Sequence, residues 1–425
     1  MTRDALGNPA SGNPEAVRHL DDAVDRSLGH DGGVVAAVRA AIRADPTFGL
    51  PHALLALTDP SADATESLDR AVLLVQHGSD RERSLVGFLD SLIRSGMWAA
   101  EQAGLDHARA HPRDLLGVGL AATVVERSAR PDVHEAVLAV YAPSVRALGA
   151  HPFLQCMTGF VAQEQGHFDE AERLATQALQ AEPASVTAAH LRAHVYVETG
   201  EHDVSLDWLD GFRHRMDPSG DYVHHMAWHA ALHALARGDV ADVLRRLGEL
   251  SGPGCDPLRQ VVDNGTLLMR CRLCGVLAPG EDPTHGLAGA VPDSWLVDLP
   301  SMYVAFHAAV GLAVQGRHDE LVALASRAAQ MPAPGLAELL VPLSSALADY
   351  VAGRFGQAVA RLLALRPTMY RWGGSRAQRE VVEDILVDAA VRGARPDIAA
   401  LVLTERTDRR PNRWDAASLR AVSAR

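Results

Sequence analysis

The stretch Gly166-His-Phe-Asp-Glu-Ala-Glu-Arg-Leu-Ala-Thr-Gln-Ala-Leu-Gln-Ala-Glu-Pro183 decides the fold class of this chain. Behind the glycine, apolar residues recur three and four positions apart, which is the spacing of one face of an α-helix. A proline at position 183 ends that helix, because proline has no amide hydrogen and its ring clashes with the turn before it. The stretch therefore predicts a glycine turn, an amphipathic helix and a sharp stop.

The same unit recurs along the chain, which indicates an array of helix pairs. Gly200 follows Gly166 by 34 residues. Further turns of this kind open at Gly238, Gly316 and Gly353. A period of 34 residues is similar to that of tetratricopeptide repeats, in which small residues let paired helices approach closely. The later spacings are irregular, so we expect a degenerate array with inserted loops near 251–260 and 277–300.

These patterns predict an all-α protein, because few segments show the alternation of β-branched residues that strands need. The expected architecture is a degenerate tetratricopeptide-like α-α superhelix, or solenoid. Four regions are expected along the chain. They are a flexible N-terminal segment at 1–14, N-terminal helical hairpins at 15–150, the superhelix with a histidine-rich site at 151–410, and a C-terminal tail or capping helix at 411–425.

The chain has 425 residues and no lysine, so all 40 of its basic residues are arginine. This composition excludes Schiff-base chemistry on a lysine and the lysine-dependent designs for phosphoryl transfer. The accompanying excess of Ala, Arg, Gly and Val is typical of a GC-rich bacterial genome. The exclusions hold whatever the cause of the bias.

Charge and hydropathy bear on the partners. The net charge is −13, with acidic residues spread along the chain and no basic stripe carrying aromatic residues. We therefore expect no nucleic-acid partner. No window approaches 18 uninterrupted apolar residues, so no membrane span is expected. The N-terminus lacks the apolar run of a signal peptide, and four cysteines offer no disulfide framework, so the expected location is cytoplasmic.

Several motifs resemble the tetratricopeptide repeat protein 38 family, almost from end to end. The most specific is the string Gly373-Gly-Ser-Arg-Ala-Gln-Arg379. The others are Asp4-Ala-Leu-Gly-Asn8, Arg81-Glu-Arg83, His111-Pro-Arg-Asp114, Glu164 before the HFDEAE turn, His190-x-x-x-His194, His225-x-x-Trp228-His229, Asp263 with Arg270, and His307. The resemblance implies a tetratricopeptide-like superhelix and a shared site, but no settled reaction.

The chain departs from that family at three positions. The family usually has a histidine where this chain has Gln155, a glutamate where it has Val197, and an acidic residue where it has Phe306. If those groups do chemistry in relatives, the resemblance implies that the chemistry of this chain is altered or lost.

Histidine is concentrated in one stretch, with eight of the 20 between positions 190 and 233. His190 and His194 are four residues apart, so they share one helix face. The next predicted helix pair repeats this step at His225, His229 and His233. Neighbouring helices in such an array run antiparallel, so we expect the two stripes to face each other. Imidazoles placed in this way could hold a metal, transfer protons or bind an anion.

These uses share the same candidates. A divalent metal is possible on His190, His194, His225 and His229, although neither pair is an HExxH motif; no organic cofactor is expected. For acid–base catalysis, the same four histidines would act with Glu164 and Asp263. Any single histidine is better interpreted as a hydrogen-bonded packing residue, whereas the cluster as a whole favours a functional pocket.

Further residues are expected to bind the ligand. Arg270 lies seven positions after Asp263, so we expect both on one helix face, where Arg270 could clamp a carboxylate or phosphate or form an internal ion pair. The other expected ligand-binding residues are Trp228, His307, Gly373, Gly374, Ser375, Gln378 and Arg379. The glycine turn before Ser375 either caps a helix or binds an anion. The lone Cys271-x-x-Cys274 pair is expected to pack in the core.

Two functions follow from these candidates. The first is a protein or enzyme that binds a small anionic molecule and could perform hydrolysis, elimination or cyclisation on it. The second is a non-catalytic scaffold that binds a partner protein or peptide in a concave groove. Arginine and asparagine usually carry peptide binding in such grooves, whereas this chain has few asparagines and its polar cluster is rich in histidine. The sequence therefore favours binding of a small molecule.

Overall fold

The computed structural model describes residues 2–250, 256–278, 281–285, 290–331, 333 and 335–424. Across these residues the protein is built of helices, apart from one antiparallel pair of short strands, β1 (Thr2–Arg3) and β2 (Pro9–Ala10). The prediction of an all-α protein is confirmed. None of the described helices is both long enough and apolar enough to cross a membrane.

The first part of the chain forms helical hairpins around one apolar core. Its elements are α1 (Pro14–Gly29), α2 (Val34–Ala44), α3 (Gly49–Thr58), α4 (Ala64–Leu74), the 3-10 turn Val75–His77, α5 (Asp80–Ser95), α6 (Met97–Ala110), α7 (Leu115–Glu126) and α8 (Val133–Leu148). Consecutive helices pack on each other, as short connections dictate. Residues 2–13, where we expected a flexible segment, form the strand pair and lie against these hairpins, since the Ser11 amide donates to Glu82.

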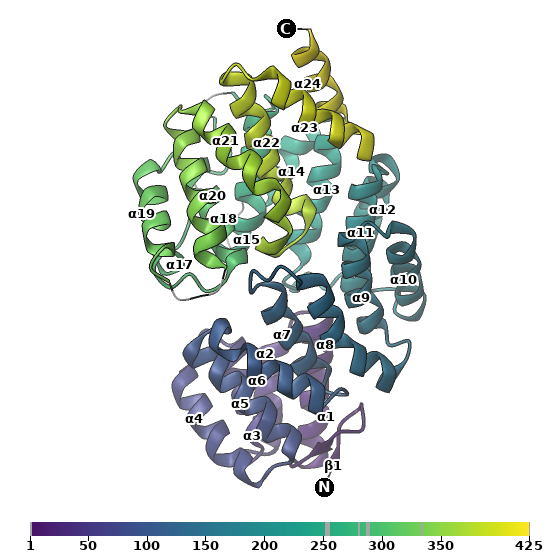
Figure 1. Cartoon of the computed structure of the whole chain (residues 1–425). Coiled ribbons are helices and arrows are strands. Elements are labelled where there is room, and N and C mark those ends of the chain that lie inside the picture. The colour runs from purple at the N-terminus through teal and green to yellow at the C-terminus, as the bar shows by residue number, and fades with distance from the viewer. Residues whose placement is uncertain are drawn as a thin grey trace.

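A second group continues the pattern of helix pairs. It consists of α9 (Pro152–Glu164), α10 (Phe168–Ala181), α11 (Val186–Thr199), α12 (His202–Phe212), the 3-10 turn Arg213–Arg215, α13 (Val223–Arg237) and α14 (Val240–Leu250). The segment that decided the fold class is thus the turn into α10 and the helix itself. In Figure 1, α9–α12 run along one side of the molecule, between the N-terminal hairpins and the C-terminal part.

The C-terminal part is larger and shares one apolar core with α11–α14. Its elements are α15 (Pro257–Arg259), the π-helical turn Gln260–Gly265, α16 (Thr266–Leu273), α17 (Asp293–Asp298), α18 (Met302–Val314), α19 (His318–Ala328), α20 (Leu336–Val351), α21 (Phe355–Leu365), the 3-10 turn Arg366–Trp372, α22 (Arg376–Arg392), α23 (Pro396–Arg409) and α24 (Arg413–Ser423). The two expected loops are partly helical, at 257–260 and 293–298. Residues 251–255, 279–280 and 286–289 of those loops lie outside the described residues.

The repeated glycines do what their sequence positions predicted. All five adopt positive φ angles, between 69° and 83°, within two residues of a helix end: Gly166, Gly200, Gly238, Gly316 and Gly353. This left-handed conformation ends a helix and turns the chain, and glycine adopts it without a steric penalty from Cβ. The glycine period is therefore a period of helix ends.

Candidate functional site

A cavity of about 480 Å³ lies where the N-terminal hairpins meet the rest of the chain. This volume is within the usual range for small-molecule sites, roughly 300–1,000 Å³. Residues of α7, α8 and α9 line one side of the cavity. Residues of α11, α13, α15, α18 and the turn before α22 line the other side. The cavity thus lies at the boundary between the two apolar cores.

Four histidines meet beside this cavity. His190 and His194 project from α11, and His225 and His229 from α13, and these two helices pack on each other. The Nε2 atom of His190 lies 2.8 Å from Nε2 of His194 and 2.9 Å from Nε2 of His225. One nitrogen from each ring can be chosen so that all four lie within 4.8 Å of one another. The expectation that the two stripes face each other is confirmed, and the group could hold a metal ion.

Asp263 fixes the proton on one of these rings. Its carboxylate oxygens lie 3.0 and 3.1 Å from Nδ1 of His225, so Nδ1 carries the hydrogen and donates it. A neutral imidazole has only one N–H. Nε2 of His225 therefore carries no hydrogen, and its lone pair is directed at His190. A carboxylate behind a histidine in this way is the arrangement that orients metal-binding imidazoles.

Burial keeps the cluster uncharged. It lowers the pKa of His194 to about 3 and holds the pKa values of His190 and His229 well below their usual range. Burial opposes ionisation of Asp263 as well, but the neighbouring His225 and Arg259 outweigh it and hold the pKa of that carboxyl below its usual value. The cluster therefore presents neutral imidazoles, the form that binds metals.

His229 differs from an ordinary packing histidine. It is fully buried, and neither of its ring nitrogens has a hydrogen-bond partner among the described residues. Nδ1 of His194 is also buried and also lacks a hydrogen-bond partner among the described residues. Buried polar atoms without partners are rare in native proteins, because leaving one unpaired costs free energy. The histidine cluster therefore holds three such ring nitrogens, two on His229 and one on His194.

His233, the fifth member of the stripes, is fully satisfied. The Ser205 hydroxyl lies 2.8 Å from its Nε2, and its Nδ1 lies 3.0 Å from Nδ1 of His202. Nε2 of His202 in turn donates to the carbonyl of Pro411, at 3.0 Å. This chain of hydrogen bonds ties α12 and α13 to the segment before α24, so His233 is a packing residue.

Trp228 and His307, both expected to bind ligand, lie behind the cavity wall. Trp228 is fully buried and stacks on His225, with ring centroids 5.3 Å apart. Nδ1 of His307 donates to the carbonyl of Tyr303, at 2.8 Å, and burial lowers the pKa of His307 to about 3. Both residues therefore support residues of the wall.

Arg270 is not where its spacing from Asp263 predicted. It donates to the carbonyl of Ala377, at 2.8 Å, and forms ion pairs with Asp384 and Glu380. Arg270 does not line the cavity, and Asp263 pairs with His225 and Arg259 instead. The alternative, an internal ion pair, holds for Arg270, with partners on α22 in place of Asp263.

The arginine that pairs with Asp263 is Arg259, four residues before it. Nη1 of Arg259 lies 3.4 Å from Oδ2 of Asp263, and its guanidinium lies over the ring of Tyr222, 4.7 Å from the centroid. Arg127 lies over Tyr303 in the same way, at 4.6 Å. All four of these cavity residues, Arg127, Tyr222, Arg259 and Tyr303, were missed by the sequence reasoning. Only Arg259 had a local signal, its four-residue spacing from Asp263.

The turn Gly373-Gly374-Ser375 lines the cavity, but its helix start is already occupied. The Arg376 amide donates to Oε1 of Glu164 at 2.9 Å, and the Gly374 amide donates to Oε1 of Glu126 at 2.6 Å. Ser375 and Gln378 complete a capping box. The structure therefore shows the capping alternative, with carboxylates of the chain itself in the place of an external anion.

The Glu164 carboxylate, which accepts the hydrogen bond from the Arg376 amide, is also paired with Arg379. Burial raises the pKa of its carboxyl, but the ion pair with Arg379 and the Arg376 amide outweigh burial and hold the pKa below its usual value. Arg379 also donates to the carbonyls of Gly373 and Gly374. Glu164, Gln378 and Arg379 line the cavity as expected, yet an ionised, paired Glu164 is poorly suited to donate a proton.

The three cysteines among the described residues do not belong to the group that could hold a metal ion. Cys156 and Cys271 are buried, Cys274 is partly buried, and all three are free thiols. Burial raises the pKa of Cys271 to about 12, so it is a thiol at neutral pH. These observations agree with core packing; Cys255 lies outside the described residues.

A scan of the sequence against models of known protein families found no match.

Proposed function

We propose that this chain binds a small anionic molecule in the cavity, beside a divalent metal ion held by His190, His194, His225 and His229. We also propose membership of the tetratricopeptide repeat protein 38 family and a degenerate tetratricopeptide-like superhelix. The sequence motifs and the repeated glycine turns support these two points. The metal is supported by the histidine cluster itself.

The convergence of three Nε2 atoms is the observation that carries the proposal. Each close contact between ring nitrogens needs one donor and one acceptor, but His225 already uses its only hydrogen on Asp263. Nε2 of His190 can carry one hydrogen at most, and it has two Nε2 neighbours. His229 then adds unpartnered nitrogens of its own. A shared cation would satisfy all of these lone pairs at once.

The size and chemistry of the cluster suit zinc. Tetrahedral zinc with Zn–N bonds of about 2.0–2.1 Å separates its ligand nitrogens by about 3.4 Å. The observed span of 4.8 Å needs only small side-chain movements to reach that value. Imidazole ligands also suit copper and nickel, so the proposed metal is a first-row divalent ion, zinc foremost. The proposal is one of binding, because imidazoles that coordinate the metal through their lone pairs cannot also transfer protons, and Glu164 and Asp263 are both paired with arginine.

Metal analysis tests the proposal. Protein purified without a histidine tag should contain about one zinc ion per chain after incubation with zinc and desalting, measured by mass spectrometry of the metal. His190→Ala should lower that content at least tenfold. The matched control is His111→Ala, since His111 is also half-buried and also belongs to an HxxxH pair, with His107. Equal metal content in the two variants, or none in the parent protein, would refute the metal site.

A further inference from the structure

We infer that the anionic group of the ligand is an oxyanion, a carboxylate or a phosphate, bound in a cradle formed by Arg127, Arg259 and Tyr303. This inference rests on the part of the proposed function that places a small anion in the cavity, and it does not depend on the metal ion. All three residues line the cavity, so two guanidinium groups and one phenol are available to donate hydrogen bonds to the ligand.

The three residues of the cradle come from the two parts of the chain that meet at the cavity. Arg127 follows directly after α7, whereas Arg259 ends α15 and Tyr303 belongs to α18. Figure 1 shows α7 at the end of the N-terminal hairpins that meets the C-terminal part, which carries α15 and α18. Arg259 also contacts Asp263, the partner of His225, so the cradle lies beside the histidine cluster.

An aromatic ring supports each of the two guanidinium groups. Arg127 lies over the ring of Tyr303, 4.6 Å from the centroid, and Arg259 lies over the ring of Tyr222, at 4.7 Å. A cation–π contact restrains the position of a guanidinium group without using a hydrogen-bond acceptor. The N–H donors of both arginines therefore remain available to oxygen atoms, and the restraint reduces the entropy that ligand binding would cost.

Both arginines act on the same phenol. Burial raises the pKa of Tyr303, while the charges of Arg127 and Arg259 both oppose that rise, so both guanidinium groups lie within electrostatic reach of this residue. The Tyr303 hydroxyl accepts a hydrogen bond from Gln378 at 3.0 Å, and its own hydrogen has no acceptor among the described residues. Because the raised pKa keeps this hydroxyl protonated at neutral pH, it can donate to an anion beside the two arginines.

The carboxylates of the chain hold these two arginines only loosely. Nε of Arg127 lies 3.4 Å from Oε2 of Glu126, and Nη1 of Arg259 lies 3.4 Å from Oδ2 of Asp263. Charge-assisted hydrogen bonds between guanidinium and carboxylate groups are usually about 2.7–2.9 Å long. Neither contact is therefore the strong pairing that an arginine can form, and an oxyanion in the cavity could provide it.

Arg379, which also lines the cavity, lacks this freedom. It pairs with Glu164 and donates to the carbonyls of Gly373 and Gly374. Arg259 differs from it, because only 9% of the surface of Arg259 is exposed and its contact with a carboxylate is long. A guanidinium group has five N–H donors, so Arg259 keeps donors for a ligand in surroundings where water weakens a hydrogen bond little.

Three probes that share a phenyl group test the cradle on the full-length protein as purified. Benzoate and phenyl phosphate carry the two candidate oxyanions, and benzamide is the neutral counterpart of benzoate. Calorimetry should show that one or both oxyanions bind about tenfold more tightly than benzamide, or better. The tighter of the two identifies the anionic group of the ligand. Equal affinity for all three probes, or no binding of either oxyanion, would overturn the inference.

Substitutions distinguish the cradle from other modes of anion binding. Arg259→Gln and Arg127→Gln should each weaken binding of the preferred oxyanion about tenfold and leave benzamide binding unchanged. Tyr303→Phe keeps the ring beneath Arg127 and removes only the hydroxyl, so it should weaken the oxyanion by a smaller factor. The control is Arg392→Gln, because Arg392 also lies over an aromatic ring, Phe355 at 4.1 Å, but does not line the cavity.

The two arginine variants also make the outcome decisive. Arg127 is partly exposed, so Arg127→Gln provides the test even if the loss of a buried charge prevents Arg259→Gln from folding. Oxyanion binding that is unchanged in the folded arginine variants would overturn the cradle, since the anion would then bind elsewhere, for example to the metal ion. Metal content measured in parallel distinguishes the two failures, because absence of zinc would refute the metal site and leave the cradle standing.

Discussion

The Nε2 atoms of His190 and His225 lie 2.9 Å apart, although 35 residues separate them in the chain. On the opposite side of the His225 ring, the Asp263 carboxylate accepts a hydrogen bond from Nδ1. The contact therefore joins two ring nitrogens that cannot both be donors. It links the packing of α11 on α13 to the proposed metal site.

His229→Leu should separate stability from metal binding. In the metal-free protein, leucine removes two unpartnered buried nitrogens, so the free energy of unfolding should rise by about 1–3 kcal/mol. In excess zinc the parent protein should be stabilised by roughly 2.7 kcal/mol at a hundredfold excess over the dissociation constant, and the variant much less. Urea denaturation with and without zinc measures both effects. A metal-free variant less stable than its parent would contradict the assignment of His229.

Asp263→Asn should weaken metal binding without removing a ligand. The amide cannot hold the Nδ1 hydrogen of His225 as a carboxylate does, and carboxylates behind metal-binding histidines typically contribute 10- to 100-fold in affinity. A chelator competition should show this loss with the stoichiometry unchanged. The exposed Asp207→Asn serves as the control. An unchanged zinc affinity would mean that Asp263 acts only as the partner of Arg259.

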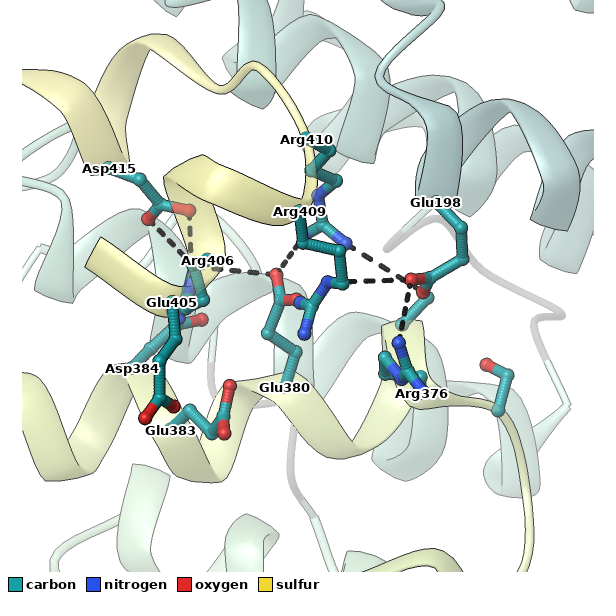
Figure 2. A network of polar contacts seen from close by, with 12 residues as sticks. Glu198, Arg376, Glu380, Glu383, Asp384, Glu405, Arg406, Arg409, Arg410 and Asp415 are labelled. Atoms are coloured by element: carbon teal, nitrogen blue, oxygen red, sulfur yellow. Dashed lines mark hydrogen bonds and ion pairs between the residues drawn. The ribbon is translucent and has the colours of Figure 1, made fainter. Parts of the chain in front are cut away.

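Glu380→Gln should detach the C-terminal helices before it affects the cavity. Figure 2 shows Glu380 of α22 among Arg406, Arg409 and Arg410, and Arg406 also pairs with Asp415. Removing one charge of a buried pair costs about 3–5 kcal/mol, because the partners remain charged and buried. Urea denaturation should show that loss, and hydrogen exchange should rise first in α23 and α24.

The control for this variant is Glu405→Gln, in a more exposed pair with Arg366. It should change the free energy of unfolding by less than about 1 kcal/mol. A comparable loss in the two variants would show that the buried network contributes nothing beyond an ordinary surface pair.

The stability of the protein should fall on acidification below pH 6.5, in part through His307. An unfolded histidine binds its proton near pH 6.5, whereas burial lowers the pKa of His307 to about 3. Between these values the unfolded chain holds more protons, so each pH unit below 6.5 removes roughly 1.4 kcal/mol per such histidine. The parent protein should therefore lose more stability than His307→Leu between pH 7 and pH 5.

Val310→Ala controls for packing in the same helix, because it removes buried apolar volume and no titrating group. It should lower the denaturation midpoint about equally at both pH values. If His307→Leu retains the full pH dependence of the parent protein, other groups account for the acid sensitivity.

Gly200→Ala should be more destabilising than Gly316→Ala. Both glycines have positive φ, 77° and 69°, so each alanine costs roughly 1–2 kcal/mol. A Cβ at Gly200 would also lie 2.4 Å from Cδ of Pro411, whereas nothing lies within 4 Å at Gly316. The extra crowding should lower the free energy of unfolding by about 1 kcal/mol more, which thermal denaturation measures. Equal losses would show that the segment at Pro411 moves aside freely.

Local features of the fold and part of the site were predictable from the sequence. The helical period, the glycine helix ends and the four-residue step of the histidines depend on contacts within one or two turns. That step, together with antiparallel packing of neighbouring helices, brought the stripes of α11 and α13 together as expected. Asp263 was also identified correctly as a neighbour of the cluster, since it bonds to His225.

The same reasoning failed wherever a residue's direction depended on distant segments. Arg270 was expected beside Asp263, but it pairs with Glu380 and Asp384 of α22, a segment far along the chain that the seven-residue spacing does not reveal. The glycine turn before α22 looked open to an anion, but Glu164, more than 200 residues earlier, occupies it.

The sequence by itself thus determined that the chain is helical, where its helices turn and which histidines share a face, because these properties follow from short-range geometry. The tertiary structure alone decided which charges meet. It paired Asp263 with Arg259, enclosed the cavity between two apolar cores, and buried His229 with no hydrogen-bond partner in the described part of the chain. Burial and charge pairing depend on the packing of remote segments, so they exist only once the whole chain has folded.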